Sequence, residues 1–169
     1  MELADFKLGE TSDSFMINTR QENHDVLLQM ITQAQHSLSM FSHNLDATLY
    51  DTGQYLAALK QLSLNNKHSK VRILIRDIDF ITKHGHRFIE LARRLPSSIE
   101  IRQTSSEYEH IITAYSIVDD RGIILRNDAL RYEAKVNFND PMLARDLLKQ
   151  FNEIWNQSEP SQEMQRLHI

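Results

Sequence analysis

The sequence predicts a single α/β domain in which a mixed sheet carries helices on both faces. The chain's 169 residues suit one domain, and its composition, 41% hydrophobic and 25% charged, is typical of a globular protein. Short β-branched segments alternate with helical segments in the first half, which favours parallel strands covered on both sides. In the second half the strands follow one another as hairpins, and one long helix closes the domain.

The domain is predicted to span residues 14–157, after a polar and unpatterned segment, residues 1–13, that is expected to be flexible. Its first strand is Ser14–Ile17. Thr19 and Glu22 then have the spacing of a capping box, which satisfies backbone N–H groups at the start of a helix. Apolar residues recur along one face of that helix, namely Val26, Leu27, Met30, Ile31 and Ala34.

Two further pairs of strand and helix complete the first half. A strand at Ser37–Phe41 precedes a helix at about Thr52–Leu64, whose apolar residues again recur at helical spacing. Val71–Asp77 is the clearest strand, because it is short, apolar and β-branched, as buried parallel strands tend to be. A third helix is predicted at Lys83–Leu95, where Pro96 stops it.

Further strands, mostly joined as hairpins, are predicted in the second half. Ile99–Arg102 alternates like a strand with one exposed face. A hairpin joins Ile111–Val118 to Ile123–Leu125 through Asp119–Gly122, in which the glycine is expected to accept a positive φ. Another strand is expected at Ala134–Phe138.

The last helix has a clear start and a regular apolar face. Asp140 suits the N-cap position and Pro141 the first helical position. The apolar residues that follow are Ala144, Leu147, Leu148, Phe151, Ile154 and Trp155. Residues 158–169 are expected to form a flexible tail.

Composition narrows the classes of function. The formal net charge of -4 gives no general attraction to nucleic acid or anionic lipid. The absence of cysteine excludes disulfides and a thiolate nucleophile and fits a reducing, cytoplasmic location. No apolar stretch approaches membrane-spanning length, and four glycines form no phosphate-binding loop, so neither membrane association nor a cofactor is expected.

The order of elements over residues 14–157 resembles one repeat of the phospholipase D superfamily, and residues 110–155 carry the resemblance most specifically. The signature of that family is His-x-Lys-x-x-x-x-Asp, followed after six residues by Gly-Ser-x-Asn. Leu91–Ser97 and Arg126–Val136 are similar to a branch of small bacterial phospholipase D-like domains without assigned function. The resemblance implies a single-repeat phospholipase D-like fold, and in active relatives two repeats complete one site.

The residues that carry the family's chemistry are missing from the matching positions. With the motif's aspartate on Asp119, its histidine position falls on Ile112, its lysine position on Ala114 and its asparagine position on Ala129. Isoleucine supplies no nucleophile and alanine no charge to balance a phosphate, although phosphoryl transfer depends on positioning and electrostatics. His110 lies two residues away from the motif position, and no lysine follows it at the required spacing. We therefore expect no catalytic residues.

A remnant anion pocket is predicted where the strands end, because open α/β sheets bind ligands beyond the carboxyl ends of their strands. Arginines there would grip a phosphate or carboxylate with paired hydrogen bonds. An alternative is that Arg131 and Glu133 form an ion pair or join a network with Asp119. The candidate residues are His43, Asn44, Arg76, Asp77, His110, Asp119, Arg126, Asn127, Arg131 and Glu133.

Two other sites are weaker hypotheses. Asp77, Asp79, His84 and His86 have donor atoms that a divalent metal accepts, but Asp79 equally suits a helix cap, so no metal is predicted. A nucleic-acid surface would need the scattered basic residues to meet on one face. These residues are Lys70, Arg72, Arg76, Arg93, Arg94 and Arg102.

Three functions remain open from the sequence. The first is a non-catalytic phospholipase D-like binding or scaffold module that binds a protein partner or a second copy of itself. The second is a divergent phosphodiesterase or nuclease that uses His43, His110 or the Asp-His cluster in a new arrangement. The third is a nucleic-acid accessory protein, whose binding would depend steeply on salt.

Overall fold

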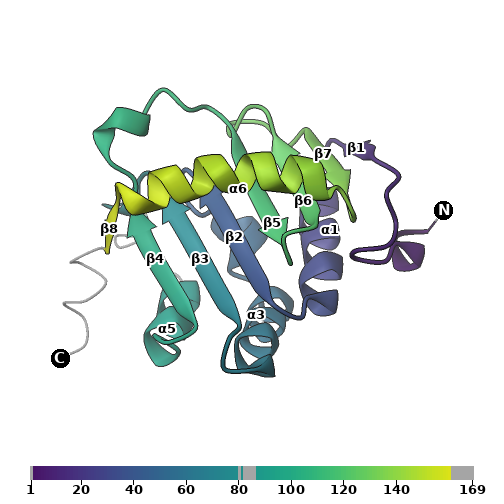
Figure 1. Cartoon of the computed structure of the whole chain (residues 1–169), viewed down its shortest axis with the longest axis horizontal. Coiled ribbons are helices and arrows are strands. Elements are labelled where there is room, and N and C mark those ends of the chain that lie inside the picture. Colours follow the sequence, from purple (N-terminus) through teal and green to yellow (C-terminus); the bar gives the residue numbers. More distant parts are fainter. Residues whose placement is uncertain (1, 80, 82–86, 161–169) are drawn as a thin grey trace.

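The computed structural model describes residues 2–79, 81 and 87–160. Within these residues one sheet of eight strands runs through the molecule in the order β1-β7-β6-β5-β2-β3-β4-β8 (Figure 1). The strands are β1 (Phe15–Ile17), β2 (Ser37–Ser42), β3 (Lys70–Ile75), β4 (Ile99–Gln103), β5 (Ala114–Val118), β6 (Gly122–Arg126), β7 (Ala134–Asn137) and β8 (Glu159–Pro160).

The sheet is mixed, as the sequence predicts. Strands β2, β3 and β4 are parallel neighbours, and β2 also pairs with β5, where the antiparallel part begins. Phe41 lies opposite Tyr115 in that pair, so the carboxyl end of β2 meets the start of β5. This register brings residues from distant parts of the chain to one edge of the sheet.

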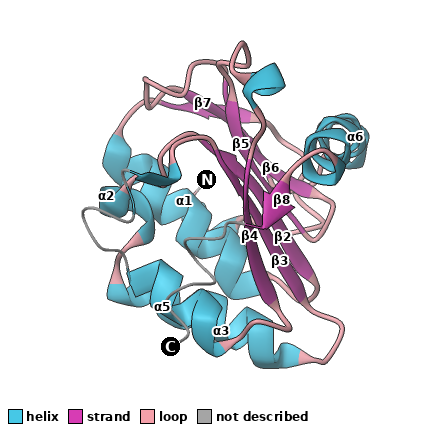
Figure 2. Ribbon diagram, turned by 90° about the vertical axis from the view of Figure 1, so that its left-hand side faces the viewer, coloured by secondary structure: helices cyan, strands magenta, loops and turns pink. Residues whose placement is uncertain are grey.

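Helices cover both faces unequally (Figure 2). Helices α1 (Arg20–Gln33), α2 (Ala47–Tyr50), α3 (Gly53–Asn65) and α5 (Arg87–Arg94) lie on one face, and α6 (Pro141–Asn156) lies alone on the other. Short 3-10 helices occupy Leu3–Asp5 and Ser106–Tyr108. The hydrophobic core is accordingly divided into a larger part and a smaller one centred on α6. No helix in the described ranges is both long and apolar enough to cross a membrane.

Helix starts follow the sequence closely. Thr19 and Glu22 form the predicted capping box, and the Asp140 side chain accepts a hydrogen bond from the backbone of Leu143, with Pro141 in the first turn. The third helix is predicted to start at Lys83, which lies outside the described residues. The structure describes the corresponding helix, α5, from Arg87.

Helix α6 is attached to the sheet by aromatic rings and two arginines. The Arg72 guanidinium lies 4.8 Å from the centre of the Phe151 ring, and that of Arg102 lies 4.4 Å from a ring of Trp155. Arg72 also donates to Asn152 at 2.9 Å and to Ser39 at 3.2 Å. Cation–π contacts of this kind add to the burial of the rings, so these two arginines serve the fold.

The β5–β6 turn differs from the sequence prediction. The residues with positive φ are Asp119 and Asp120, at 54° and 57°, and Gly122 is not among them. Aspartate tolerates this backbone region better than most residues do. Gly122 meets a different constraint, since an added Cβ would lie 2.6 Å from Cδ1 of Leu8 and 3.1 Å from the sulfur of Met30. The glycine at this position therefore reflects close packing against these two side chains rather than backbone conformation.

Two predicted strands are shorter than expected. Strand β3 ends at Ile75 rather than Asp77, and β5 begins at Ala114 rather than Ile111. The residues released at both ends, 76–77 and 111–113, form loops beside each other, since Arg76 donates to the carbonyl of Ile111.

The chain termini contact the domain where the sequence suggested loose segments. Phe6 is buried in the core, and the side chain of Gln33 accepts from the backbone of Leu8 and donates to the carbonyl of Phe6. Residues Glu159 and Pro160 pair with the end of β4. The remaining tail residues, 161–169, lie outside the described residues.

Candidate anion-binding site

A cavity of about 200 Å³ opens at the carboxyl end of β2, next to the start of β5 and the end of β6. It lies at the edge of the sheet where the sequence predicts a pocket. Its lining residues are Ser42, His43, Asn44, Asp46, Ala114, Arg126, Ala129, Leu130 and Tyr132.

Arg126, the last residue of β6, supplies the positive charge of the cavity. Its Nε donates to the carbonyl of Arg131 at 2.6 Å and its Nη2 to the carbonyl of Ala129 at 2.7 Å. The guanidinium also lies 5.2 Å from the ring centre of Tyr132. No carboxylate of the described residues lies within ion-pair distance of it. The loop after β6 therefore folds around a cation whose charge is not neutralised.

His43 also lines the cavity and is held in one tautomer. Its Nε2 is 3.0 Å from the carbonyl oxygen of Thr113. Since a carbonyl oxygen only accepts, Nε2 carries the hydrogen and Nδ1 keeps its lone pair. Burial, and then the neighbouring charge of Arg76, lower the pKa of His43 below 6.5. The imidazole is therefore neutral at pH 7.

Arg76 follows β3 and lies behind His43. Its Nη2 donates to the carbonyls of Tyr108 and Ile111, which ties the loop before β5 to the end of β3. Its Nε is buried and has no hydrogen-bond partner among the residues that are described. Arg76 thus acts on the cavity through its charge on His43 and does not line it.

Sequence reasoning missed Asp46 and Tyr132, whose side chains line the cavity. Asp46 caps α2 by accepting from Thr48, and its second oxygen accepts from the Tyr132 hydroxyl at 3.0 Å. Tyr50 does not line the cavity; it is buried, and burial raises its pKa to about 12 despite the neighbouring charge of Arg126. The spacing of Asp46 and Thr48 is a signal for a helix cap, but nothing in the sequence points to Tyr132 or Tyr50.

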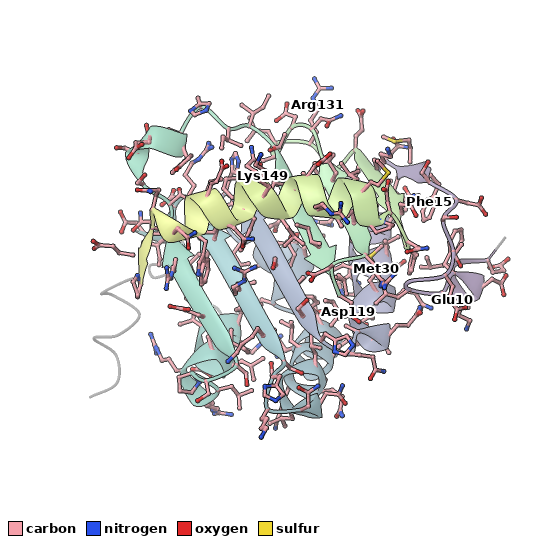
Figure 3. All side chains as sticks on the ribbon, viewed as in Figure 1. Glu10, Phe15, Met30, Asp119, Arg131 and Lys149 are labelled. Atoms are coloured by element: carbon pink, nitrogen blue, oxygen red, sulfur yellow. The ribbon has the colours of Figure 1, made fainter. Side chains whose placement is uncertain are left out.

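Asp119 is a candidate that the structure places elsewhere. Its carboxylate accepts hydrogen bonds from the backbone N–H groups of Gln35, His36 and Ser37, at 2.8, 2.8 and 2.9 Å. Gln35 and His36 precede β2 and Ser37 is its first residue, whereas the cavity lies beyond the other end of the strand. Figure 3 shows Asp119 and Arg131 on opposite sides of α6. Asp119 therefore holds the start of β2 and belongs neither to the cavity nor to a network with Arg131.

Arg131 and Glu133 match the ion-pair alternative. Arg131 lies 3.9 Å from the Glu133 carboxylate and 3.8 Å from that of Asp128, and its side chain is 71% exposed. Asp77, His110 and Asn127 are exposed and do not line the cavity. Of the ten sequence candidates, only His43, Asn44 and Arg126 line it.

The metal hypothesis gains no support. The described residues contain no group of three or more histidine, aspartate or glutamate side chains that could hold a metal ion. Two of the four donors suggested by the sequence, His84 and His86, lie outside the described residues.

Three of the positions aligned by sequence with the phospholipase D motif lie at the cavity. Ala114, Arg126 and Ala129, at the lysine, glycine and asparagine positions, all line it. Ile112, at the histidine position, is 61% exposed and lies beside the cavity, since its carbonyl accepts from the backbone of Ala129. The register taken from Asp119 is therefore consistent with the geometry.

The shifted pKa of His43 predicts a pH dependence of stability. The unfolded chain binds a proton at this histidine more readily than the folded chain, so the folded state loses stability as pH falls below about 6.5. The free energy of unfolding of the parent should therefore fall more steeply than that of His43→Gln as pH is lowered from about 7.5 to 5. Urea unfolding measures this, and parallel pH curves for the two proteins would exclude the shift.

Solved structures with this architecture belong to proteins of diverse kinds. The chain aligns over 88% of its length with TrmBL2, an archaeal chromatin protein with a novel mode of DNA binding, at a TM-score of 0.63 and 15% identity. It spans 54% of that protein's length. Nuc from Salmonella typhimurium, a phospholipase D family member, aligns at a TM-score of 0.61 and 20% identity, with 88% of this chain and 97% of Nuc covered.

NucT from Helicobacter pylori aligns at a TM-score of 0.61 and 11% identity, with 88% of this chain and 99% of NucT covered. At such identities the likeness shows the fold alone, which is phospholipase D-like. Comparison with curated protein sequences gives no match. The model of the family described as "Domain of unknown function (DUF7931)" matches residues 19–167. The chain, a single-repeat phospholipase D-like α/β domain, therefore belongs to the DUF7931 family.

Proposed function

We propose that this chain is a non-catalytic binding module whose cavity receives a phosphate or carboxylate group of a ligand. The observation that carries the proposal is the guanidinium of Arg126, which has no ion-pair partner among the described residues and lines a cavity of about 200 Å³. Residues aligned with the phospholipase D motif lie at this cavity. A cavity of this size accommodates one such group together with a small adjoining part of a ligand.

The lining supports binding better than catalysis. Arg126 and the Asn44 amide are donors for anion oxygens, and two of the other lining residues, Ala114 and Ala129, are small. Nothing at the positions aligned with the phospholipase D histidine and lysine, Ile112 and Ala114, supplies a nucleophile or a second cation. The Asp46 carboxylate, which would repel an anion, is engaged by Tyr132 and by Thr48.

Anion binding should respond to pH through His43. A bound anion favours the imidazolium form of His43, and a protonated Nδ1 becomes a further donor, so affinity should rise as pH falls below about 6.5. Sulfate is a suitable probe because its own charge is constant over this range.

The test is titration of the protein with sulfate and with acetate, followed by heteronuclear NMR. The parent should show shifts confined to residues around the cavity, and Arg126→Gln should weaken sulfate binding by about tenfold or more. Arg131→Gln is the matched control, since Arg131 is nearby, exposed and outside the cavity. Because Arg126 also holds its loop through hydrogen bonds, its replacement could act by changing the loop. Asn44→Ala, at an exposed position, is therefore a second test and should weaken sulfate binding less than Arg126→Gln. Equal affinity in the parent and both cavity variants would contradict the proposal.

A divergent phosphodiesterase is the second candidate, and one observation favours it. His43 is neutral, its Nδ1 lone pair is free of the Thr113 contact, and it shares the cavity with Arg126. Such an imidazole is chemically able to attack phosphorus beside a stabilising cation. Nuc and NucT have the same fold, which adds only a general precedent.

A nucleic-acid accessory role is less well supported, although TrmBL2 is a DNA-binding protein of the same fold. Arg72 and Arg102 are stacked on aromatic rings of α6, Arg76 donates to backbone carbonyls, and Lys70 donates to the carbonyl of Ser97. These four cations are therefore engaged in contacts within the domain.

The scaffold aspect of the proposal rests on the rim of the cavity. Ile112 and Leu130, which are 61% and 91% exposed, lie on adjoining segments linked by the hydrogen bond from Ala129 to Ile112. An apolar rim next to a polar cavity suits a protein partner, including a second copy of the chain. Light scattering should show a mass above that of the monomer for self-association, and Leu130→Glu should reduce it.

A further inference from the structure

We infer that a second site, a groove between α6 and the β5–β6 turn, binds an acidic segment of a partner protein. It is independent of the anion cavity, which lies at the other end of β5. The groove has a volume of about 760 Å³, and Lys149 and Asp119 in Figure 3 mark its two walls. Its lining residues are His36, Asp119, Asp120, Arg121, Pro141, Arg145, Leu148, Lys149 and Asn152.

Three cations at the groove have no internal partner. Arg121 comes from the turn, Arg145 from the facing side of α6, and Lys149 lies one helical turn further along. In the part of the chain that the structure describes, none of their side chains makes a hydrogen bond or an ion pair. Arg145 and Lys149 also repel each other weakly, which a bound carboxylate would relieve. Arginines on two walls suit carboxylates, which they bind with paired hydrogen bonds.

The two acidic residues of the groove differ in whether their carboxylates already accept hydrogen bonds. Both oxygens of Asp119 already accept backbone hydrogen bonds, so its charge is largely compensated. Asp120 is exposed, and within the described ranges it makes no hydrogen bond, although its charge acts on Arg72. The groove therefore offers unpaired cations together with one free acceptor.

This combination fits a peptide better than a nucleic acid. A peptide with glutamate or aspartate side chains supplies carboxylates for the arginines and backbone N–H donors for Asp120, whereas a phosphodiester backbone carries acceptors only. Pro141 and Leu148 provide apolar contact for a peptide side chain. The groove's lining contains no phenylalanine, tyrosine or tryptophan on which a base would stack.

The test is fluorescence anisotropy at low ionic strength with a labelled synthetic peptide of alternating glutamate and leucine residues. The double variant Arg121→Glu with Arg145→Glu should weaken binding by about tenfold or more. The double variant Lys60→Glu with Lys67→Glu is the matched control, since it changes the net charge equally at exposed positions of and after α3, on the other face of the sheet (Figure 2). It should change affinity by less than about twofold.

Further variants and probes separate the alternatives. Arg126→Gln should leave peptide binding unchanged, and thermal melts should show that all variants fold. The milder Arg145→Gln should weaken binding several-fold. The inference is overturned if the parent does not bind the peptide, if the two double variants weaken binding equally, or if Arg126→Gln abolishes it. Tighter binding of a short single-stranded oligonucleotide would also overturn it.

Discussion

Replacing Phe151 with alanine should destabilise the domain by about 3–5 kcal/mol. Phe151 is fully buried between α6 and the sheet. Its ring is stacked on that of Trp155, with ring centres 5.7 Å apart, and the Arg72 guanidinium lies 4.8 Å from the centre of the Phe151 ring. The substitution removes the ring and leaves a cavity. It also removes the cation–π contact between the Arg72 guanidinium and the Phe151 ring. Because α6 is the only described helix on this face, no other helix of the described residues compensates (Figure 2).

Urea unfolding measures this effect as a lower midpoint with an unchanged slope. Glu153→Ala is the control, since Glu153 is an exposed residue of the same helix and its replacement should change stability by less than about 0.5 kcal/mol. A loss below about 1 kcal/mol for Phe151→Ala would show that α6 contributes little to the core.

The second large effect is expected at Asp119. Asp119→Ala removes an acceptor of three backbone hydrogen bonds and leaves N–H groups of residues 35–37 without their partner, at a cost of about 2–4 kcal/mol. The cost is large because a carboxylate accepts more strongly than a neutral group.

Asp120→Ala provides an internal control. Asp119 and Asp120 have nearly equal positive φ, so alanine meets the same backbone strain at both positions. The Asp120 variant should lose only about 1 kcal/mol, and the difference between the two measures the hydrogen bonds. Equal losses in chemical denaturation would mean that the three hydrogen bonds contribute nothing net.

Asp119 also shows where sequence reasoning about the site fails. Matching it to the phospholipase D motif gave a register whose positions 114, 126 and 129 line the cavity, but it also suggested that Asp119 joins the pocket. The five residues of β5 lie between the cavity and the turn, and at about 3.3 Å per residue they separate Asp119 from it by roughly 17 Å. Motif spacing thus aligns the residues along the strand with the motif. Whether a residue lies near the cavity depends on which end of the strand it occupies.

The elements themselves were predictable because their signals are local. The Thr19 capping box, Asp140 with Pro141, and the apolar periodicity of α1 and α6 each depend on residues a few positions apart. Tyr132 and Asp46 meet only through the fold, being 86 residues apart in the chain. Gly122 likewise depends on contacts with Leu8 and Met30, which no local pattern reveals.

Turnover of a generic phosphodiester, such as bis(p-nitrophenyl) phosphate, tests the central claim most directly. The assay compares the parent with His43→Ala and His110→Ala, with and without divalent metal. A binding module should give the same background rate in all three proteins. Turnover by the parent that His43→Ala abolishes would contradict the account and make the cavity the active site of a rearranged phosphodiesterase.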